Sequence, residues 1–443
     1  MMEYIIEPQK RLQVCEEVDL CVIGGSCTGL FAAVRAARLG LRVALVEKLN
    51  CLGGTATAGM VNIWHSLHDF YGEKQIIAGL TGETIQRLEK KGAVARGEAA
   101  HVAYRLNTEE LKLTLDEYVR ECGIVVYFHT FYCTPVVKDN KITHIIIENK
   151  SGRQAIRAGF FIDASGDGDM AAHLGLESYR NGHIQPPTPC YHLQSDKVLN
   201  VPELLQAHGA EFGLREDWGW GSPIPGLEHI SLRADTHVFG TDCADAKELS
   251  RSELEGRRQI GAALDVLRKY GGCQVTLAGV CAQLGIRETR HFVTRYKVTQ
   301  EDILIGRVFE DAIGYGTYRV DKHHSDTAGI SFLYLDGTME THYDRTSPPE
   351  RGRWRAEGEH ALYYQIPFRM LVQEQYANFI PVGRMLHADE GAFGALRVMV
   401  NLNQMGEAAG VAAYCCIDEN TPVQKADTAR VRALMKAGGS LIF

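Results

Sequence analysis

Residues 18–59 constrain the fold of this chain most strongly, because apolar runs and glycine turns follow one another there in a fixed order. Residues 19–23 (DLCVI) have the length of a buried parallel strand. A glycine turn, residues 24–29 (GGSCTG), leads into residues 30–39 (LFAAVRAARL), which are rich in helix formers. A second apolar run follows at 42–46 (RVALV). The order predicts a strand, a glycine turn, a helix and a parallel strand.

The unit has the residue types of a dinucleotide-binding site. Gly24 permits the tight turn, the small Ser26 lets a pyrophosphate approach the backbone, and Gly29 lets helix and strand pack closely. The helix N-terminus presents N–H groups and a positive dipole end to phosphates. Glu47 follows the second strand and favours an unphosphorylated ribose as its hydrogen-bonding partner. An ordinary βαβ unit with a glycine-rich turn is the alternative.

A second glycine loop follows directly. Residues 49–59 (LNCLGGTATAG) offer backbone N–H groups and hydroxyls to another part of a bound cofactor.

Composition excludes several classes of protein. The chain has 443 residues and a formal charge of −8 without a basic block, which argues against nucleic acid as a partner. No apolar run is long enough for a membrane span, and the N-terminal residues lack the apolar core of a signal peptide. The 12 cysteines are scattered without metal-type spacing. We expect a cytoplasmic protein with reduced thiols and no metal site.

The rest of the first 175 residues predicts a mixed region. We expect a leading hairpin or extended segment at 1–17. Further along the chain, the pattern predicts helices at 76–91 and 108–122, the second capped by Thr108, and then strands at 124–128, 134–138, 142–149 and 154–158. Residues 159–168 predict a buried strand that runs into a Gly/Asp turn. The two helices followed by this series of strands suggest an antiparallel flap inserted in a doubly wound fold.

Beyond residue 175 the pattern weakens and then returns. Residues 176–375 are rich in Gly, Pro and aromatic residues, with one long helix expected at 244–270. Near the end, a short strand and glycine turn at 378–384 precede a helix expected over 393–416. We therefore predict an α/β fold: a Rossmann-like domain with a central parallel sheet and an inserted β-meander, built from 1–175 and 376–443, and an α+β capping or substrate domain at 176–375.

Three blocks of the sequence resemble a known family. Residues 22–59, 161–174 and 380–412 are similar to the FAD-dependent oxidoreductases of the glutathione-reductase-like superfamily, in particular to the bacterial group with an LGGxxTxG-type loop. Residues 285–292 (GIRETRHF) resemble a further stretch of the same group. The resemblance implies non-covalently bound FAD.

The resemblance also implies which residues hold that cofactor. They come from the two glycine loops, the strand ends and the last helix, and they are Gly24, Gly25, Ser26, Cys27, Thr28, Gly29, Glu47, Lys48, Gly53, Gly54, Thr55, Ala56, Thr57, Ala164, Ser165, Gly166, Asp167, Gly383, Arg384, Asn401 and Gly406. Asp163 belongs to the same block as Ala164.

The second glycine loop lacks the cysteines of the disulfide reductases in this superfamily. It reads GGTATAGMV at 53–61, where those enzymes carry a redox cysteine pair. Only one dinucleotide fingerprint is visible in the chain. Both observations argue against a pyridine-nucleotide disulfide reductase.

Two arginines and two tryptophans are candidates for substrate contacts. Arg287 and Arg290 could clamp a substrate carboxylate in bidentate fashion. Glu288, which lies between them, could instead form an internal salt bridge. Trp218 and Trp220 could line a pocket or serve in packing.

Four histidines are candidates for chemistry. His323 and His324 are predicted general acid or base groups, since imidazole titrates near neutral pH, although adjacent loop histidines are as often solvated. His65 and His68 follow the second glycine loop, so either could contact a cofactor ring or carry a covalent link.

The resulting hypothesis is an FAD-dependent oxidoreductase. It would transfer a hydride between a small organic substrate and FAD, with a further electron donor or acceptor as partner. The alternatives are a flavoprotein with a non-redox or group-transfer role, a nucleotide- or redox-sensing binding protein, and an NAD-dependent dehydrogenase.

Overall fold

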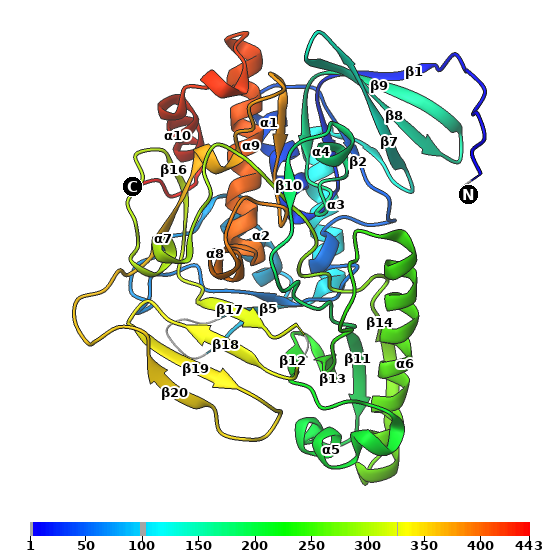
Figure 1. Cartoon of the computed structure of the whole chain (residues 1–443), viewed down its shortest axis with the longest axis vertical. Helices are drawn as coiled ribbons and strands as arrows, with labels where there is room; N and C mark the ends of the chain where they lie inside the picture. Colours follow the sequence, from blue (N-terminus) through cyan, green and yellow to red (C-terminus); the bar gives the residue numbers. More distant parts are fainter. Residues whose placement is uncertain (1–2, 98–102, 326) are drawn as a thin grey trace.

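A mixed seven-stranded sheet forms the centre of the protein (Figure 1). The computed structural model describes residues 3–97, 103–325 and 327–443. Five strands run parallel, and β8 and β7 continue the sheet antiparallel beyond β9. In spatial order the path is β6 (Val125–Tyr127), β2 (Val43–Val46), β1 (Val14–Ile23), β9 (Gly152–Asp163), β8 (Lys141–Asn149) and β7 (Phe131–Lys138), with β22 (Phe379–Pro381) also beside β9. The predicted α/β class with a central parallel sheet is confirmed.

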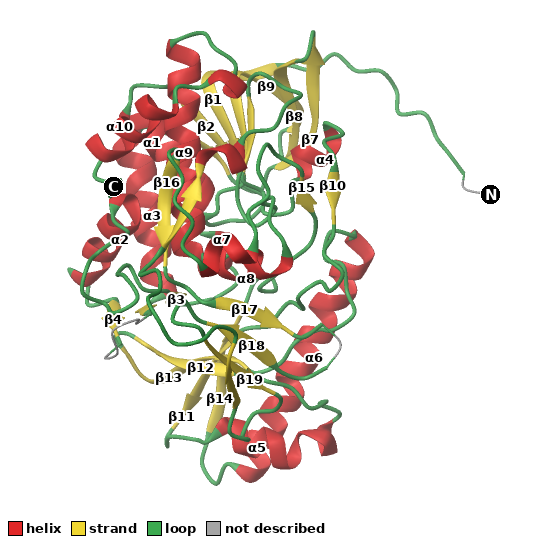
Figure 2. Cartoon of the chain, turned by 60° about the vertical axis from the view of Figure 1, so that its left-hand side comes forward, coloured by secondary structure: helices red, strands yellow, loops and turns green. Residues whose placement is uncertain are grey.

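The carboxyl-terminal end of strand β1, residues 20–23, is apolar and buried on both faces of the sheet. Leu20 and Val22 belong to the core on one side of the sheet, while Cys21 and Ile23 belong to the core on the other. The strand begins at Val14, inside the segment expected to be a hairpin or extended. Residues 3–13 carry no regular structure and run away from the body of the protein (Figure 2).

The carboxyl ends of the five parallel strands are aligned, so the loops that follow these strands lie close together. Ile23 pairs with Val46 on one side and with Asp163 on the other. Val46 pairs with Tyr127, and Pro381 pairs with Asp163. The residues that follow each strand therefore emerge side by side at the carboxyl edge of the sheet, where open α/β sheets bind ligands.

The predicted meander is an extension of the same sheet rather than a separate flap. The expected strands at 134–138 and 142–149 correspond to β7 and β8. The segments 154–158 and 159–163, expected as two strands, are one strand, β9. It is continuous because β1 pairs along its length, while β8 and β22 share its other edge.

Helices cover one face of the sheet. Helices α1 (Cys27–Arg38), α3 (Thr108–Cys122) and α9 (Met399–Asp418) share one core, with α2 (Gly79–Glu89) and α10 (Thr428–Ala437) packed on α9. Asn107, not Thr108, caps α3, because the Asn107 side chain accepts from the N–H groups of residues 109 and 110. A buried ion pair, Arg35 Nε to Glu407 Oε2 at 2.7 Å, ties α1 to α9.

The contact between α1 and α9 depends on glycine. A Cβ at Gly406 would lie 2.1 Å from the Thr28 carbonyl oxygen, and a Cβ at Gly410 would lie 2.1 Å from the Ala32 carbonyl oxygen. The small residues expected in the last helix thus allow the two backbones to approach closely.

Replacing Gly410 with alanine is expected to lower the free energy of unfolding by about 1–3 kcal/mol, since the added methyl group overpacks the α1–α9 contact. Gly261→Ala is the matched control, because Gly261 lies in α6 (Ala246–Tyr270) and, apart from its chain neighbours and the backbone of its own helix, no atom of the described residues lies within 4 Å of the place its methyl group would take. The control should raise stability by about 0.4–1 kcal/mol. Urea titrations of both variants provide the comparison, and a shift of the same sign in both would contradict this packing account.

Residues 176–375 supply two further antiparallel sheets in the lower half of the molecule (Figure 1). Helix α6 is the helix expected at 244–270, and it packs with α5 (Val201–His208) on the first of these sheets. The first sheet holds β12 (Trp220–Ile224), β13 (Leu227–Ala234), β11 (Tyr191–Ser195) and β14 (Val275–Val280), and the second holds β17 (Val320–His323), β18 (Ile330–Leu333), β19 (Thr338–His342) and β20 (Glu350–Arg353). The division into domains at residues 175 and 375 stays a prediction.

Smaller elements connect the two halves. They are the three-stranded sheet β3 (Ile63–Trp64), β5 (Tyr104–Leu106) and β4 (Val94–Arg96), the pair β10 (Ser178–Tyr179) and β15 (His291–Phe292), the pair β16 (Ala312–Gly316) and β21 (Tyr364–Pro367), and the short helices α4 (Asp169–His173), α7 (Gln300–Leu304) and α8 (Glu390–Leu396). Within the described ranges, no helix combines the length and apolar character needed to cross a membrane.

Candidate functional site

The glycine turn after β1 is packed so closely that side chains would not fit. Gly24 has φ +97°, and a Cβ there would lie 2.4 Å from the Ala164 carbonyl oxygen. A Cβ at Gly29 would lie 2.0 Å from the Gly24 carbonyl oxygen. The Ser26 hydroxyl caps α1 by accepting from the Gly29 N–H at 3.2 Å. The N-terminus of α1 therefore opens directly onto the turn.

Glu47 and the second glycine loop complete a cradle around this turn. Glu47 is 6% exposed and accepts from the Gly25 N–H at 2.6 Å and from the Leu49 N–H at 2.8 Å. The Gly53 N–H donates to the Gly25 carbonyl at 2.8 Å. The two glycine loops, which α1 and β2 separate in the sequence, thus lie against each other. We call residues 24–29, 47 and 53–55 the glycine cradle.

The remaining residues of the second loop brace it. The Thr57 hydroxyl donates to the Leu52 carbonyl, and Ala56 and Thr57 are both buried. Lys48 is exposed, whereas Cys27 and Thr28 are buried in the first turn of α1.

The block that follows β9 holds its own turn together. Asp163 is buried and accepts from the N–H and hydroxyl of Ser165 and from the N–H groups of Met170 and Ala171. Burial raises the pKa of Asp163 to about 6. Asp163 and Ser165 thereby fix the position of Ala164, whose carbonyl touches Gly24.

Arg384 extends from the late glycine turn over this block. Its guanidinium pairs with Asp167 at 2.6 Å and donates to the Thr289 hydroxyl at 3.0 Å. Arg290 joins the same group, since its Nε donates to the Asp167 carbonyl at 2.7 Å and its Nη2 pairs with Asp169 at 3.1 Å. Arg290 was expected to clamp a substrate beside Arg287, but these contacts hold its side chain against the turn that follows β9.

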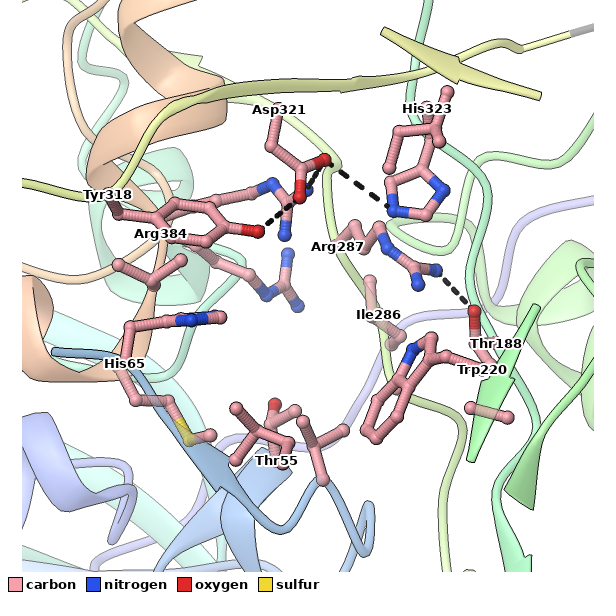
Figure 3. Close-up of a pocket in the computed structure, with 18 of the residues that line it drawn as sticks. Thr55, His65, Thr188, Trp220, Ile286, Arg287, Tyr318, Asp321, His323 and Arg384 are labelled. Atoms are coloured by element: carbon pink, nitrogen blue, oxygen red, sulfur yellow. Dashed lines mark hydrogen bonds and ion pairs between the residues drawn. The ribbon is translucent and has the colours of Figure 1, made fainter. Parts of the chain in front are cut away.

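A cavity of about 350 Å³ adjoins the cradle (Figure 3). Thr55 and Arg384 of the predicted cofactor set line it, and so do Arg287, His323, His65, Trp218 and Trp220. Further lining residues come from β17, β18 and the start of α9. The cavity thus joins the carboxyl edge of the central sheet to side chains supplied by residues 176–375.

A carboxylate in the cavity wall joins three other polar groups. Asp321 is 4% exposed, accepts a hydrogen bond from the Tyr318 hydroxyl and pairs with Arg397 Nη2 at 2.9 Å. His323 Nε2 lies 3.6 Å from Asp321 Oδ1. Burial and the neighbouring Asp321 raise the pKa of Tyr318, while burial and the neighbouring Arg287 hold the pKa of His323 well below its usual value. At neutral pH the phenol is therefore protonated and the imidazole is neutral.

The four candidate histidines separate into two groups. His323 and His65 line the cavity, and the His65 ring lies on the Tyr318 ring with centroids 3.9 Å apart. Burial, with a contribution from Arg319, lowers the pKa of His65 to about 3. His324 contacts the Ser331 hydroxyl at 3.0 Å and the Ala328 carbonyl at 3.2 Å instead.

Strand alternation explains why His324 points away. Asp321 and His323 are two residues apart on β17 and share a face; His324 follows the last residue of the strand, where the same alternation directs a side chain to the opposite face. His68 also lies outside the cavity lining, with its carbonyl accepting from Thr317. The alternation was present in the sequence and could have separated His323 from His324.

Arg287, the other arginine expected to clamp a substrate, lines the cavity. Its Nη1 donates to the Pro186 carbonyl at 2.8 Å and to the Thr188 hydroxyl (Figure 3). Glu288 does not pair with it: this buried carboxylate pairs with His291 at 3.0 Å and accepts from the Gln185 N–H. Burial, with a contribution from Arg397, lowers the pKa of Arg287 to about 10, so the side chain is still a cation at neutral pH.

The helix expected over 393–416 is broken, and the break supplies part of the site. Helix α8 ends at Leu396 and α9 begins at Met399, so Arg397 and Val398 lie between them and line the cavity. Neither glycine nor proline marks this break in the sequence, and Arg397 was missed for that reason.

Two predicted cofactor contacts on α9 have other partners. The Asn401 amide donates to the Tyr364 hydroxyl at 2.9 Å and to the Ala395 carbonyl at 3.0 Å. Gly406 faces α1 in the helix contact described above. The geometry gives both residues a role in packing α9 rather than at the cavity.

Comparison with known proteins identifies the family. The sequence model described as "FAD dependent oxidoreductase" matches residues 19–435. The match spans nearly the whole chain, so the chain belongs to this family of flavin-dependent enzymes, whose cofactor is FAD.

Individual relatives match shorter parts. Digeranylgeranylglycerophospholipid reductase 2 of Methanothermobacter thermautotrophicus is 27% identical over 169 residues, which are 36% of this chain and 42% of that protein. The mitochondrial dihydrolipoyl dehydrogenase of Schizosaccharomyces pombe is 51% identical over 55 residues, 11% of each chain. The chain thus matches less than half the length of either relative. Among solved structures, a geranylgeranyl bacteriochlorophyll reductase-like protein of Thermoplasma acidophilum has a TM-score of 0.47 at 12% identity, covering 96% of this chain and 82% of that one.

Proposed function

We propose that this member of the FAD-dependent oxidoreductase family transfers a hydride between a small organic substrate, bound in the cavity, and non-covalently bound FAD. One observation carries the proposal: Thr55 and Arg384 belong to the predicted cofactor set and also line the cavity. A cofactor that extends from the glycine cradle past these two residues would therefore reach the space in which a substrate fits.

The cradle has the shape and chemistry that FAD needs. Gly24 and Gly29 let the turn pack tightly against Ala164 and against itself, so the turn leads straight into the N-terminus of α1, where a pyrophosphate would bind. The two oxygens of Glu47 accept from the N–H groups of Gly25 and Leu49, and the carboxylate lies at the end of β2, where an adenosine ribose would bind. Gly53, Gly54 and Thr55 would contact the middle of the cofactor from the opposite side.

When bound, FAD supplies the two-electron chemistry. The chain supplies orientation and the proton. Tyr318 carries a proton at neutral pH and donates it in a hydrogen bond to Asp321, so this pair can hold or pass a proton at the cavity wall. Arg397 stabilises the negative charge of Asp321 at 2.9 Å.

Other features of the protein follow from the same proposal. We assign 1–175 and 376–443 to one FAD-binding domain because β22 pairs with β9 and α9 packs on α1, and we assign 176–375 to a capping domain. A second reactant, an electron donor or acceptor, would complete the redox cycle. The negative formal charge of −8 leads us to propose no nucleic-acid partner, and the sequence leads us to propose a cytoplasmic location.

Anaerobic absorption spectroscopy tests the proposal. The holoenzyme is mixed with candidate organic substrates. A true substrate is expected to remove nearly all of the oxidised-flavin absorbance and to yield one oxidised product molecule for each flavin reduced. A non-redox flavoprotein or a binding protein would keep its oxidised spectrum with every compound, even though chemical reductants bleach it. That outcome would exclude the redox function while leaving FAD binding intact.

A further inference from the structure

The cavity wall carries more positive than negative charge. Four arginines line it, Arg287, Arg319, Arg384 and Arg397, against one carboxylate, Asp321. Arg384 pairs with Asp167 and Arg397 pairs with Asp321. In the part of the chain that the structure describes, neither Arg287 nor Arg319 has a carboxylate within 4.0 Å.

The two unpaired arginines differ in what they offer a ligand. The Arg319 guanidinium lies 3.8 Å from the centre of the Phe332 ring, and its Nε is fully buried. Arg287 is held at one nitrogen only, because Nη1 donates to the Pro186 carbonyl and the Thr188 hydroxyl. Its Nε and Nη2 have no acceptor among the described residues, and they are not among the fully buried atoms without a partner. They therefore keep accessible surface where the side chain lines the cavity.

The free edge of Arg287 matches one ligand group in particular. Nε–H and Nη2–H of a guanidinium point in parallel and fit the two oxygens of a carboxylate. A buried cation without a counter-charge is unfavourable, and a bound anion relieves that cost. Because two neutral oxygens fix Nη1, the pair of donors Nε–H and Nη2–H, which we call the fork, is already oriented before a ligand binds.

The surroundings of Arg287 are apolar and aromatic. Trp218, Trp220, Ile286, Ile330 and Phe332 line the same cavity. Figure 3 shows Trp220 and Ile286 next to Arg287 and Thr188, with Thr55 and His65 at the other side of the space. Flat apolar side chains of this kind bind the body of a ligand, while a small number of polar groups fix its orientation.

We propose that the substrate site takes a carboxylic acid with an aromatic or similarly flat apolar body, bound as the carboxylate by Nε and Nη2 of Arg287. The proposal rests on the proposed function, since it names the substrate class of that same cavity. It places the carboxylate on the edge of the Arg287 guanidinium opposite Nη1, and the apolar body between the tryptophans and the cofactor side of the cavity.

The test is a binding experiment with acids and their neutral counterparts. Benzoate, phenylacetate and indole-3-acetate, each beside its primary amide, are titrated into the oxidised holoenzyme, and binding is followed by the perturbation of the flavin spectrum and by the melting temperature. At least one acid is expected to bind about 10- to 100-fold more tightly than its amide, the range for hydrogen bonds to a charged group. An amide series that binds as tightly as the acids, or no binding by any acid, would overturn the proposal.

Variants then test whether Arg287 causes the preference for the acid over its amide. Arg287→Met should remove the difference between acid and amide, and Arg287→Lys, which keeps the charge without the fork, should retain only part of it. Arg180→Met is the control, because it removes an arginine that pairs with Asp242, is 47% exposed and lies outside the cavity lining. A full preference for acid in Arg287→Met would refute the assignment.

The outcomes separate this proposal from the one on which it rests. A holoenzyme that is bleached by a substrate but prefers no acid over its amide contradicts the carboxylate assignment alone. A protein that binds no FAD contradicts the proposed function, and in that case the melting temperature still reports whether the acids bind.

Discussion

Gly24→Val is expected to yield a protein that no longer retains FAD. The added side chain would begin 2.4 Å from the Ala164 carbonyl oxygen, at a backbone position with φ +97°. A β-branched residue at such a φ costs about 1–3 kcal/mol of strain, and overpacking adds about 1–3 kcal/mol more. The turn must shift to relieve the collision, and its shift moves the backbone that a pyrophosphate would approach.

Gly40→Val separates the collision from the strain. Gly40 lies beyond the other end of α1 with φ +99°, nearly the value of Gly24, but apart from Gly40 and its two chain neighbours no atom of the described residues lies within 4 Å of its Cβ position. This control should lose some stability and still bind FAD in a one-to-one ratio. FAD released by denaturation and measured by fluorescence gives the ratio, and circular dichroism shows whether each apoprotein is folded. A folded Gly24→Val protein with full FAD content would contradict the location of the cradle.

Tyr318→Phe is expected to slow the reduction of the flavin by about 10²- to 10⁴-fold, the usual contribution of a positioned acid or base. The Tyr318 hydroxyl donates to Asp321 and lines the cavity, so its removal takes away the proposed path for the proton. Stopped-flow measurement under anaerobic conditions, with the first substrate that bleaches the flavin, gives the rate. FAD content should stay unchanged, because Tyr318 is not part of the glycine cradle.

Tyr334→Phe is the matched control for this substitution. The Tyr334 hydroxyl also donates to a carboxylate, Glu340 at 3.1 Å, but it lies outside the cavity lining. Its rate should stay within a factor of about two to three of the parent protein. Equal slowing in both variants would indicate a general structural effect and would contradict the role of Tyr318.

The pH dependence of the same rate distinguishes the phenol from the imidazoles. Burial lowers the pKa of His65 to about 3 and holds the pKa of His323 well below its usual value. Both rings therefore stay neutral as the pH falls through about 6.5, whereas an unperturbed histidine would gain a proton there. We expect no step near that pH in the rate profile. A step there that disappears in His323→Gln would show that His323 titrates during turnover.

The glycine cradle was predictable because its signals are local. Gly24, Gly29 and Glu47 have fixed spacing within one βαβ unit, and each spacing reflects a single turn or strand end. The register of the sheet then brings Ala164 and Arg384 to the same edge. Parallel strands made that meeting predictable without knowledge of the side-chain packing.

The cavity wall depends on packing between segments that are distant in the sequence, and no local sequence pattern encodes that packing. Asp321 gains its role from Arg397, which reaches it only because the helix breaks after Leu396. Arg290 was expected to contact the substrate, but its Nε donates a hydrogen bond to the main-chain carbonyl of Asp167. Only His324 could have been excluded from sequence, through the alternation of β17.

The role of the glycine cradle, to hold FAD and bring it to the cavity, is tested by the absorption spectrum of the purified protein during anaerobic titration with substrate. This role predicts a flavin spectrum, one FAD released per chain on denaturation, and bleaching of that spectrum by a carboxylic acid substrate. A colourless protein that does not take up added FAD, with bound nicotinamide or no nucleotide at all, would contradict it.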